Sequence, residues 1–357
     1  MRSKAWHQAQ TELPKKFEVG RAASLNMEFS GKYFTMRSKI ICQIALGALF
    51  FGPVMTTHAQ DYPDKTVRVI VPTAPGGGMD RVARIVSEKL AEKWGKPFTV
   101  ENRAGAGGNL GGEQVFKAAP DGYTLMISAT GPLINNKNLY AKLAYDSDRF
   151  VPVSLIAESP QALAVYSKVE AGSIQQLIAL AKERPDKLNY GTPGNGTTPH
   201  LSAELFKSMA NVKIVHVPFK GSPPAFAALL GGQIDMLFDA IGTMLPHIKA
   251  GTIRPLAVSG AKRHASLPDV PALNEVLPGY IALTWYGMAG PPELPVAIVN
   301  KLSTAIAEIV RQPDVQKRMR EISTEPIGST PAEFAQFMKR EREVWGNVIR
   351  SNGIAAD

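Results

Sequence analysis

Cysteine is almost missing from this chain of 357 residues, because Cys42 is the only one. Cys42 lies inside an apolar run, residues 40–55, and the residues directly before it lack the small side chain of a lipoprotein processing site. The chain after this run has no cysteine. Disulfide bonds, thiol nucleophiles and cysteine-based metal sites are therefore excluded from it.

The apolar run is shorter than the roughly 20 residues that a membrane-spanning helix needs. Arg37 and Lys39 precede the run, and the sequence THA (57–59) places small residues at the two positions that a signal peptidase recognises. This pattern is typical of a secretory signal peptide, with a membrane anchor as the alternative. We expect residues 36–59 to be a signal peptide that is cleaved near Ala59, and the protein to be periplasmic.

The first 35 residues are polar and show no apolar periodicity. The sequence MRSK occurs at residue 1 and again at residue 36. We expect Met36 to be the true start and residues 1–35 to be a mis-called extension. A genuine extended signal is the alternative.

A large positive charge is also missing from the chain after residue 59. More than half of the formal net charge of +9 falls within the first 59 residues. The small remaining net charge is spread over the faces of the expected helices and forms no basic patch of the kind that binds nucleic acid. We expect neither a nucleic acid nor a membrane surface as partner.

The usual motifs of nucleotide and enzyme sites are absent. The only near match to a Walker loop, Gly95-Lys96-Pro97, follows a helix instead of preceding it, and the glycines of "GAGGNLG" (105–111) miss the dinucleotide spacing. The chain has neither Gly-x-Ser-x-Gly nor His-Glu-x-x-His, and its histidines after residue 59 are scattered. We therefore expect no metal, no cofactor and no catalytic centre.

The chain does contain a regular alternation of strand and helix patterns, which predicts parallel βαβ units. In the helix predicted for 79–94, for example, Val82, Val86 and Leu90 recur at helical spacing. The first set comprises strands at 66–71, 98–102 and 123–129 and helices at 79–94 and 111–119. The second set comprises strands at 161–167, 187–191, 213–219, 233–239 and 253–260 and helices at 173–183 and 200–210. Three further helices are predicted at 295–311, 313–322 and 331–350.

No low-complexity linker separates the two sets. We therefore predict two α/β lobes joined by crossing strands near 155–161 and 280–287, with a ligand cleft between the lobes.

Each set has a glycine-rich turn between a strand and a helix, at 75–78 and at 194–198. Glycine allows a ligand to approach the backbone, and the start of a helix offers unpaired N–H groups to an anion. Either turn alone is also compatible with a tight turn that binds nothing. Two such turns at matched positions favour a shared anion site.

Three polar residues near these turns have open roles. Asp80 lies in the first helical turn, where it either stabilises the helix or contacts a ligand. His200 begins its helix, where it either caps the helix or contacts a ligand. Asp239 ends a strand at the expected cleft, where it either contacts a ligand or caps the next helix.

The ordered set of motifs from residue 62 to residue 354 resembles the Bug-type (Bordetella uptake gene) receptors of tripartite tricarboxylate transporters. The stretches that carry the resemblance are "VPTAPGGGMDRVARIV", "VENRAGAGGNLGGEQVFKAAPDGYTL", "YGTPGNGTTPHLSAELF", "VPFKGSPPAFAALLGGQIDMLFD" and "IKAGTIRPLAVSGAKRHASLPDVPALNEV", with the Trp345-containing tail.

The resemblance implies a type II periplasmic binding fold. Its first lobe would comprise 61–158 and 284–357, and its second lobe 159–283. It implies a monomer that binds a small organic carboxylate and delivers it to an inner-membrane permease. The carboxylate would be held by backbone amides, small hydroxyls and water, without an ion pair from either glycine turn.

The ligand-binding residues that this reading predicts come from the two turns, from the segment after the third strand, and from the end of a later strand. They are Pro75, Gly76, Gly77, Gly78, Asp80, Ser128, Thr130, Asn136, Gly194, Asn195, Thr197, Thr198, His200 and Asp239.

Two other functions remain open at this point. The same fold can present its closed form to a histidine kinase as a sensor, or it can be a periplasmic enzyme acting on small acids.

Overall fold

The computed structural model describes residues 62–355, and the strands of this part of the chain form one ten-stranded sheet. The expected extension 1–35 and the expected signal peptide 36–59 lie outside the described residues. The sheet order is β2-β1-β3-β9-β4-β7-β5-β6, with β8 and β10 also paired to β4.

The first lobe is built on β1 (Val67–Val71), which pairs in parallel with β2 (Phe98–Asn102) and β3 (Thr124–Ser128). Its helices are α2 (Gly78–Trp94), α3 (Asn109–Phe116), α10 (Val296–Ile309) and α11 (Pro313–Glu321). Val82, Val86 and Leu90 of α2 are fully buried, as their spacing predicts. Gly95 ends α2 in the left-handed conformation, at φ 64°. The predicted parallel βαβ order is thus confirmed for this lobe.

The second lobe is built on β5 (Asn189–Thr192), which pairs in parallel with β6 (Val215–Pro218) and β7 (Met236–Ala240). Its helices are α5 (Ile174–Glu183), α6 (Thr198–Ala210), α7 (Ser222–Leu230) and α8 (Ile241–Lys249). Ser173 caps α5 by accepting a hydrogen bond from the Gln176 N–H, as predicted. The strand β8 (Ile253–Val258) pairs antiparallel with β4.

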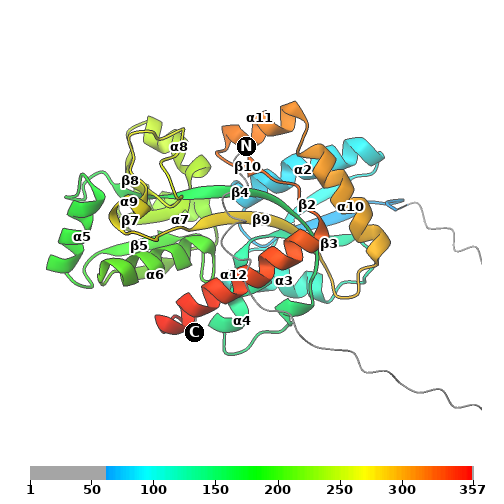
Figure 1. Cartoon of the computed structure of the whole chain (residues 1–357), viewed down its shortest axis with the longest axis horizontal. Coiled ribbons are helices and arrows are strands. Elements are labelled where there is room, and N and C mark those ends of the chain that lie inside the picture. The colour runs from blue at the N-terminus through cyan, green and yellow to red at the C-terminus, as the bar shows by residue number, and fades with distance from the viewer. Residues whose placement is uncertain (1–61, 356–357) are drawn as a thin grey trace, which may run out of the picture. The chain divides into compact units, whose positions relative to one another are not determined.

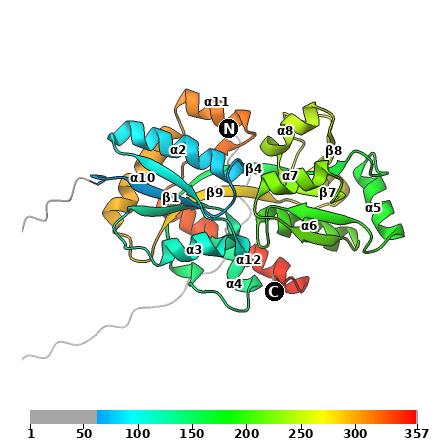
Figure 2. The same ribbon diagram turned by 180° about the vertical axis from the view of Figure 1, so that it is seen from behind.

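Two strands connect the lobes. The 16-residue β4 (Val151–Tyr166) pairs with β9 (Leu283–Gly290) along residues 151–160 and with β7 and β8 beyond them. Figure 1 shows β4 and β9 running side by side from one half of the sheet to the other. Figure 2 shows the same arrangement from behind, with α2 and α3 on one half and α6 and α7 on the other. The predicted crossing strands are therefore present.

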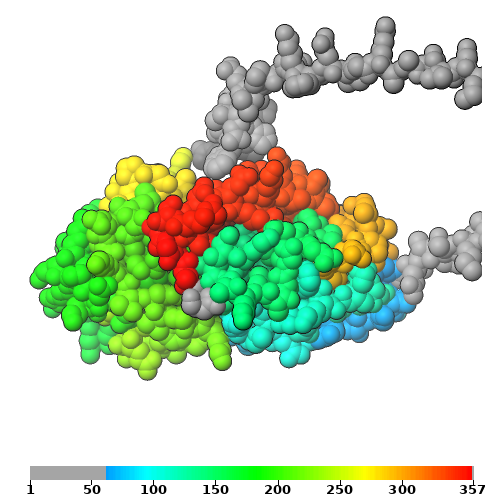
Figure 3. Space-filling view, turned by 90° about the horizontal axis from the view of Figure 1, so that it is seen from below, coloured from blue at the N-terminus to red at the C-terminus, as the bar shows by residue number. Residues whose placement is uncertain are grey.

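The C-terminal helix α12 (Pro331–Ser351) contributes to both hydrophobic cores. Phe334 and Met338 pack in a core cluster of the first lobe, whereas Trp345 and Ile349 pack in one of the second lobe. Figure 3 shows this helix, in red, extending over the boundary between the green and cyan parts of the chain. The tail therefore packs against both lobes, although the resemblance assigns it to the first.

The remaining elements are short: η2 (Ala106–Gly108), η3 (Gly131–Asn135), α4 (Asn136–Leu139), η4 (Ser147–Arg149), α9 (Leu273–Val276) and β10 (Glu325–Pro326). None of the helices within residues 62–355 has the length and apolar character to cross a membrane.

Candidate functional site

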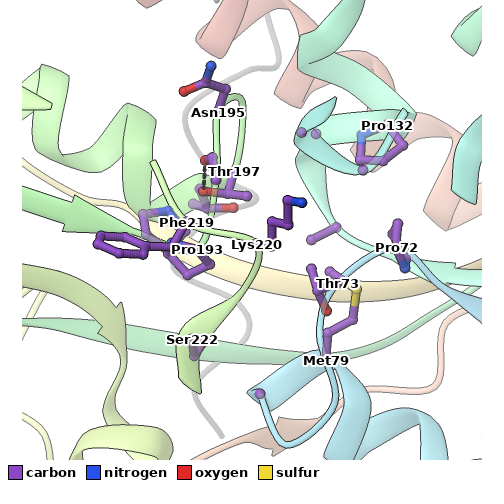
Figure 4. A pocket seen from close by; sticks show the side chains of 18 of the residues that line it. Pro72, Thr73, Met79, Pro132, Pro193, Asn195, Thr197, Phe219, Lys220 and Ser222 are labelled. Carbon is purple, nitrogen blue, oxygen red and sulfur yellow. Dashed lines mark hydrogen bonds between the residues drawn. The ribbon is translucent and has the colours of Figure 1, made fainter. Parts of the chain in front are cut away.

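A cavity of about 340 Å³ lies where the two lobes face each other. Its first-lobe wall comes from the turns after β1 and β2 and from the segment after β3, and its second-lobe wall from the turns after β5 and β6 and from the end of β7. Thr284 and Tyr286 of the crossing strand β9 also line it. Figure 4 shows side chains of both walls around this space. The carboxyl ends of strands therefore meet at one site, as expected for an α/β sheet with a ligand cleft.

The turn after β1 brings the start of α2 to the cavity. Gly77 is the N-cap residue and has no side chain to accept the first N–H groups of the helix. Gly76 has φ 88°, which favours glycine, and its N–H donates to Asp80 Oδ2 at 2.9 Å. At Gly78 a Cβ atom would collide with the hydroxyl of Tyr286. The sequence of this turn thus leaves N–H groups of the first helical turn available to a ligand.

Asp80 holds this turn in place. Its carboxylate accepts two hydrogen bonds from Arg84, at 2.9 and 3.0 Å, and one from Asn102 Nδ2 at 3.0 Å. Burial alone would raise the pKa of Asp80, but the hydrogen bonds from Arg84, Gly76 and Asn102 outweigh it and lower the pKa. Asp80 does not line the cavity, so its geometry corresponds to the structural alternative.

The turn after β5 is the counterpart in the second lobe. Gly194 has φ 143° and Gly196 has φ 72°, both in the range that favours glycine. Thr197 is the N-cap of α6, but its hydroxyl donates to the Gly194 carbonyl at 2.7 Å and does not cap the helix. The start of α6 therefore also lacks a side-chain cap, and it faces the same cavity as the start of α2.

A third glycine turn, which sequence reasoning missed as a site, lies between β2 and α3. Residues 105–108 line the cavity, and Gly105, Gly107 and Gly108 have φ of 134°, 60° and 89°. A Cβ at Gly107 would lie 2.7 Å from the Asn195 carbonyl oxygen of the other lobe. The same strand–glycine–helix pattern that identified the other two turns is present here and was a usable signal.

The two lobes contact each other around the cavity. The Thr130 and Thr198 hydroxyls are 2.9 Å apart, and Asn135 Nδ2 donates to the Gly196 carbonyl at 3.0 Å. Ala74 N–H donates to the Lys220 carbonyl at 3.1 Å. These bonds join loops of opposite lobes at the edge of the site.

The floor of the cavity carries polar groups with free hydrogen-bonding capacity. Asp239 is 3% exposed; its Oδ1 accepts the Ala240 N–H at 2.7 Å, and its Oδ2 has no hydrogen-bond partner. The hydroxyl of Thr284 has no partner either. Burial raises the pKa of Asp239 to about 6, and the neighbouring Ser222 hydroxyl, the Ala240 N–H and the neighbouring Thr243 hydroxyl oppose this shift. A ligand group that donates hydrogen bonds would satisfy Asp239 and Thr284.

One cationic side chain reaches the cavity from a position that sequence reasoning did not select. Lys220 follows β6, is exposed, and lines the cavity. Figure 4 shows it extending into the space between Thr197 and Thr73. Neither of the two predicted glycine turns supplies a lysine or arginine to the lining.

Half of the predicted ligand-binding residues line the cavity: Gly77, Gly78, Gly194, Asn195, Thr197, Thr198 and Asp239. The others lie behind or beside this lining: Pro75, Gly76, Asp80, Ser128, Thr130, Asn136 and His200. Asn136, for example, donates to the Gly107 carbonyl at 3.0 Å and so supports the third glycine turn. Within residues 62–355, no group of three His, Cys, Asp or Glu side chains is arranged to hold a metal ion.

The model of one protein family, described as "Tripartite tricarboxylate transporter family receptor", matches residues 82–354. The protein BugT of Bordetella pertussis is 31% identical over 319 residues, which cover 88% of this chain and 98% of BugT.

Two solved structures from Rhodopseudomonas palustris are similar over most of the chain. Rpa4515 with adipate has a TM-score of 0.80 and 36% identity, covering 83% of this chain and 99% of its own. MatC with bound malate has a TM-score of 0.77 and 33% identity, covering 81% of this chain and all of its own.

Proposed function

The chain belongs to the tripartite tricarboxylate transporter receptor family, and we propose that its cavity closes on a small organic carboxylate for delivery to a membrane permease. The family and the fold identify a solute-binding receptor and not an enzyme, and the family supports a periplasmic location. The sensor and enzyme alternatives gain no support from these relatives.

One observation supports a carboxylate as the chemical class of the ligand. Two helices from opposite lobes, α2 and α6, begin at the same cavity without a side-chain cap. Each helix start has unpaired N–H groups and the positive end of the helix dipole, which together favour an anion. A carboxylate between Gly77 and Thr198 would accept hydrogen bonds from both lobes. The adipate and malate in the two relatives are carboxylates as well.

The far end of the ligand faces Asp239 and Thr284 in this proposal. A carboxylate placed against the free oxygen of Asp239 would bring two like charges together in a buried site, so the second carboxylate of a dicarboxylic acid would have to point away from Asp239. A hydroxyl or amino group would instead donate to that oxygen. We therefore expect a carboxylate with a hydroxyl or amino substituent to bind more tightly than its unsubstituted analogue.

The receptor works as a monomer whose lobes, 61–158 with 284–357 and 159–283, rotate about the crossing strands. The signal peptide 36–59 exports it. The partner is an inner-membrane permease of the tripartite type. Ligand drives closure because it contacts both walls only when they approach each other.

Calorimetry with succinate, malate and aspartate tests both parts of the proposal. We expect all three to stabilise the protein in a thermal-shift assay, with malate or aspartate bound more tightly than succinate. A panel of carboxylates that leaves the melting temperature unchanged at millimolar concentration would refute the carboxylate assignment. Tightest binding of succinate would refute the role of Asp239 and leave the assignment intact.

Two matched variants test the position of the carboxylate. Thr198→Val and Thr130→Val both remove the hydroxyl pair between the lobes, but only Thr198 lines the cavity. Thr198→Val should weaken binding about tenfold to a hundredfold, because a hydrogen bond to a charged group contributes about 1.5–3 kcal/mol. Equal effects of the two variants would place the carboxylate elsewhere.

A further inference from the structure

His200 lies directly behind the turn after β5, on the side away from the cavity. It is 3% exposed and does not line the cavity. Its Nδ1 accepts the Gly196 N–H at 3.2 Å. Gly196 has φ 72° and its carbonyl accepts the cross-lobe bond from Asn135. The imidazole therefore fixes the residue at the middle of the turn that walls the site.

The ring of His200 belongs to a column of three stacked rings. It stacks on His216 of β6 at 4.1 Å between centroids and 13° between planes. His216 stacks in turn on Tyr190 of β5, at 4.8 Å and 21°. The column joins α6, β5 and β6 beneath the turn, so neither imidazole can rotate without disturbing this packing.

His216 holds the first part of the same turn. Its Nε2 is 2.7 Å from the Thr192 hydroxyl. That hydroxyl also contacts Gly194, whose N–H donates to it at 3.3 Å. The two stacked histidines therefore support the turn at Gly194 and at Gly196, which lie on either side of the cavity-lining Asn195.

The hydrogen bond from Gly196 requires a neutral His200, because a protonated imidazole has no acceptor. Burial lowers the pKa of His200 to about 4 and that of His216 to about 2. The charged groups nearest the column are Glu204 and Lys207, which pair with each other at 2.7 Å, and Glu204 also accepts from the Tyr190 hydroxyl. A proton on His200 would in addition face the positive end of the α6 dipole.

We infer that His200, supported by His216, is a positioning residue for ligand binding: its neutral Nδ1 aims the 193–198 backbone at the ligand without touching it. This inference rests on the proposed carboxylate site. According to this inference, the two histidines affect the affinity for the ligand as well as the packing of the lobe.

Two substitutions distinguish the role of His200 Nδ1 as a hydrogen-bond acceptor from the role of the side chain in filling space. In His200→Asn the side-chain oxygen occupies approximately the place of Nδ1, whereas in His200→Gln it occupies approximately the place of Nε2. We expect His200→Asn to bind malate within about threefold of the wild type. His200→Gln should bind about tenfold more weakly, which is the effect of one lost hydrogen bond.

His264→Gln is the matched control. His264 Nδ1 accepts the Ser266 N–H at 3.2 Å in a loop of the same lobe, and His264 does not line the cavity. This variant loses an equivalent bond and should keep wild-type affinity. Circular dichroism tests whether all three variants are folded.

Amide hydrogen exchange of Gly196, followed by NMR in the unliganded protein, tests the hydrogen bond without any ligand. Exchange at Gly196 should accelerate at least tenfold in His200→Gln and stay near the wild-type rate in His200→Asn. Unchanged exchange in His200→Gln would overturn the inference, and so would accelerated exchange with unchanged affinity. If wild-type protein binds no carboxylate, the proposed function fails, while the exchange rates still decide whether His200 fixes the turn.

Discussion

Gly221, directly after Lys220, is the position where a single methyl group should oppose closure of the lobes. Its φ is 132°, and a Cβ built there would lie 2.9 Å from Ala74 Cβ and 3.0 Å from Ala74 N in the opposite lobe. The same Ala74 N–H donates to the Lys220 carbonyl. Gly221→Ala therefore inserts an atom where two backbones from different lobes are already in contact.

The size of the effect follows from this geometry. Adding a methyl group to a closely packed contact typically costs about 1–3 kcal/mol. The clash exists only when the lobes approach, so it should reduce ligand affinity, by roughly 5- to 150-fold. The unfavourable φ also lowers the free energy of unfolding. This cost is the same with the lobes together or apart, so it does not change the affinity.

Calorimetry with malate measures the affinity, and small-angle scattering measures the compaction that ligand causes. Gly279→Ala is the control, because Gly279 also has a positive φ, 91°, but its added Cβ would meet no atom within 4 Å. It should lower stability and leave affinity unchanged. If Gly221→Ala binds and compacts like the wild type, the lobes do not approach at Ala74 in the bound state and the reasoning is wrong.

Three further predictions follow from the site and one from the N-terminus. Asp239→Asn should reduce the preference for malate over succinate that calorimetry measures. In the wild type the same preference should fall between pH 7 and pH 5, because the carboxyl of Asp239, with a pKa of about 6, takes up a proton in this interval. Urea denaturation of His200→Asn and of the wild type should be compared between pH 6.5 and pH 4. As the pH falls, the free energy of unfolding of the variant should rise relative to that of the wild type, by up to about 3 kcal/mol. The sign follows because burial lowers the folded pKa of His200 to about 4, so the unfolded chain takes up the proton first and the wild type loses stability over this interval. Asp80→Asn should lower the free energy of unfolding by about 1–3 kcal/mol in urea, since it weakens the hydrogen bonds to Arg84. N-terminal sequencing of the exported protein should begin at or near Gln60, and finding residues 1–35 would contradict the cleavage.

The regular part of the fold could be predicted because its signals are local. β1 is a short β-branched run, and α2 shows helical spacing with a glycine stop, so both elements appear within two residues of the expected positions. The helices α7 and α8 were not predicted. The prolines of α7 lie in its first turn, where they are compatible with a helix, so this helix was predictable, whereas α8 contains Pro246, which is a signal against a helix interior.

The glycine turns were the strongest local signal of the site. Two of them lead to the cavity, and a third, at 105–108, also lines it, although its glycines do not fit a nucleotide fingerprint. Gly77 shows the limit of such reasoning. Its φ is −74°, which any residue adopts, and a Cβ there would lie 3.4 Å from the Ser222 hydroxyl, an ordinary contact distance, so neither backbone strain nor crowding requires glycine at this position.

Other parts of the site depend on contacts between distant segments, which one sequence does not reveal. Thr284 reaches the floor because β9 crosses between the lobes, and Lys220 reaches the wall through the turn after β6, in a stretch that carries the resemblance but does not by itself identify Lys220 as a lining residue. His200 was correctly placed at a helix start. Its position behind the turn depends on His216, 16 residues later on another strand, which stacks against it.

The distribution of charge explains how such a site can both bind and release its ligand. If one lobe held the anion in a buried ion pair, the anion would stay bound when the lobes are apart. Its departure would leave the charged side chain of that lobe buried without a partner. Here the N–H groups are divided between α2 and α6, so neither lobe alone supplies the full set. The difference in affinity between the approached and separated lobes is the only free energy with which a ligand can drive closure. In the proposed function, dividing the donors increases that difference, and separation of the lobes by the permease lowers the affinity for the same ligand.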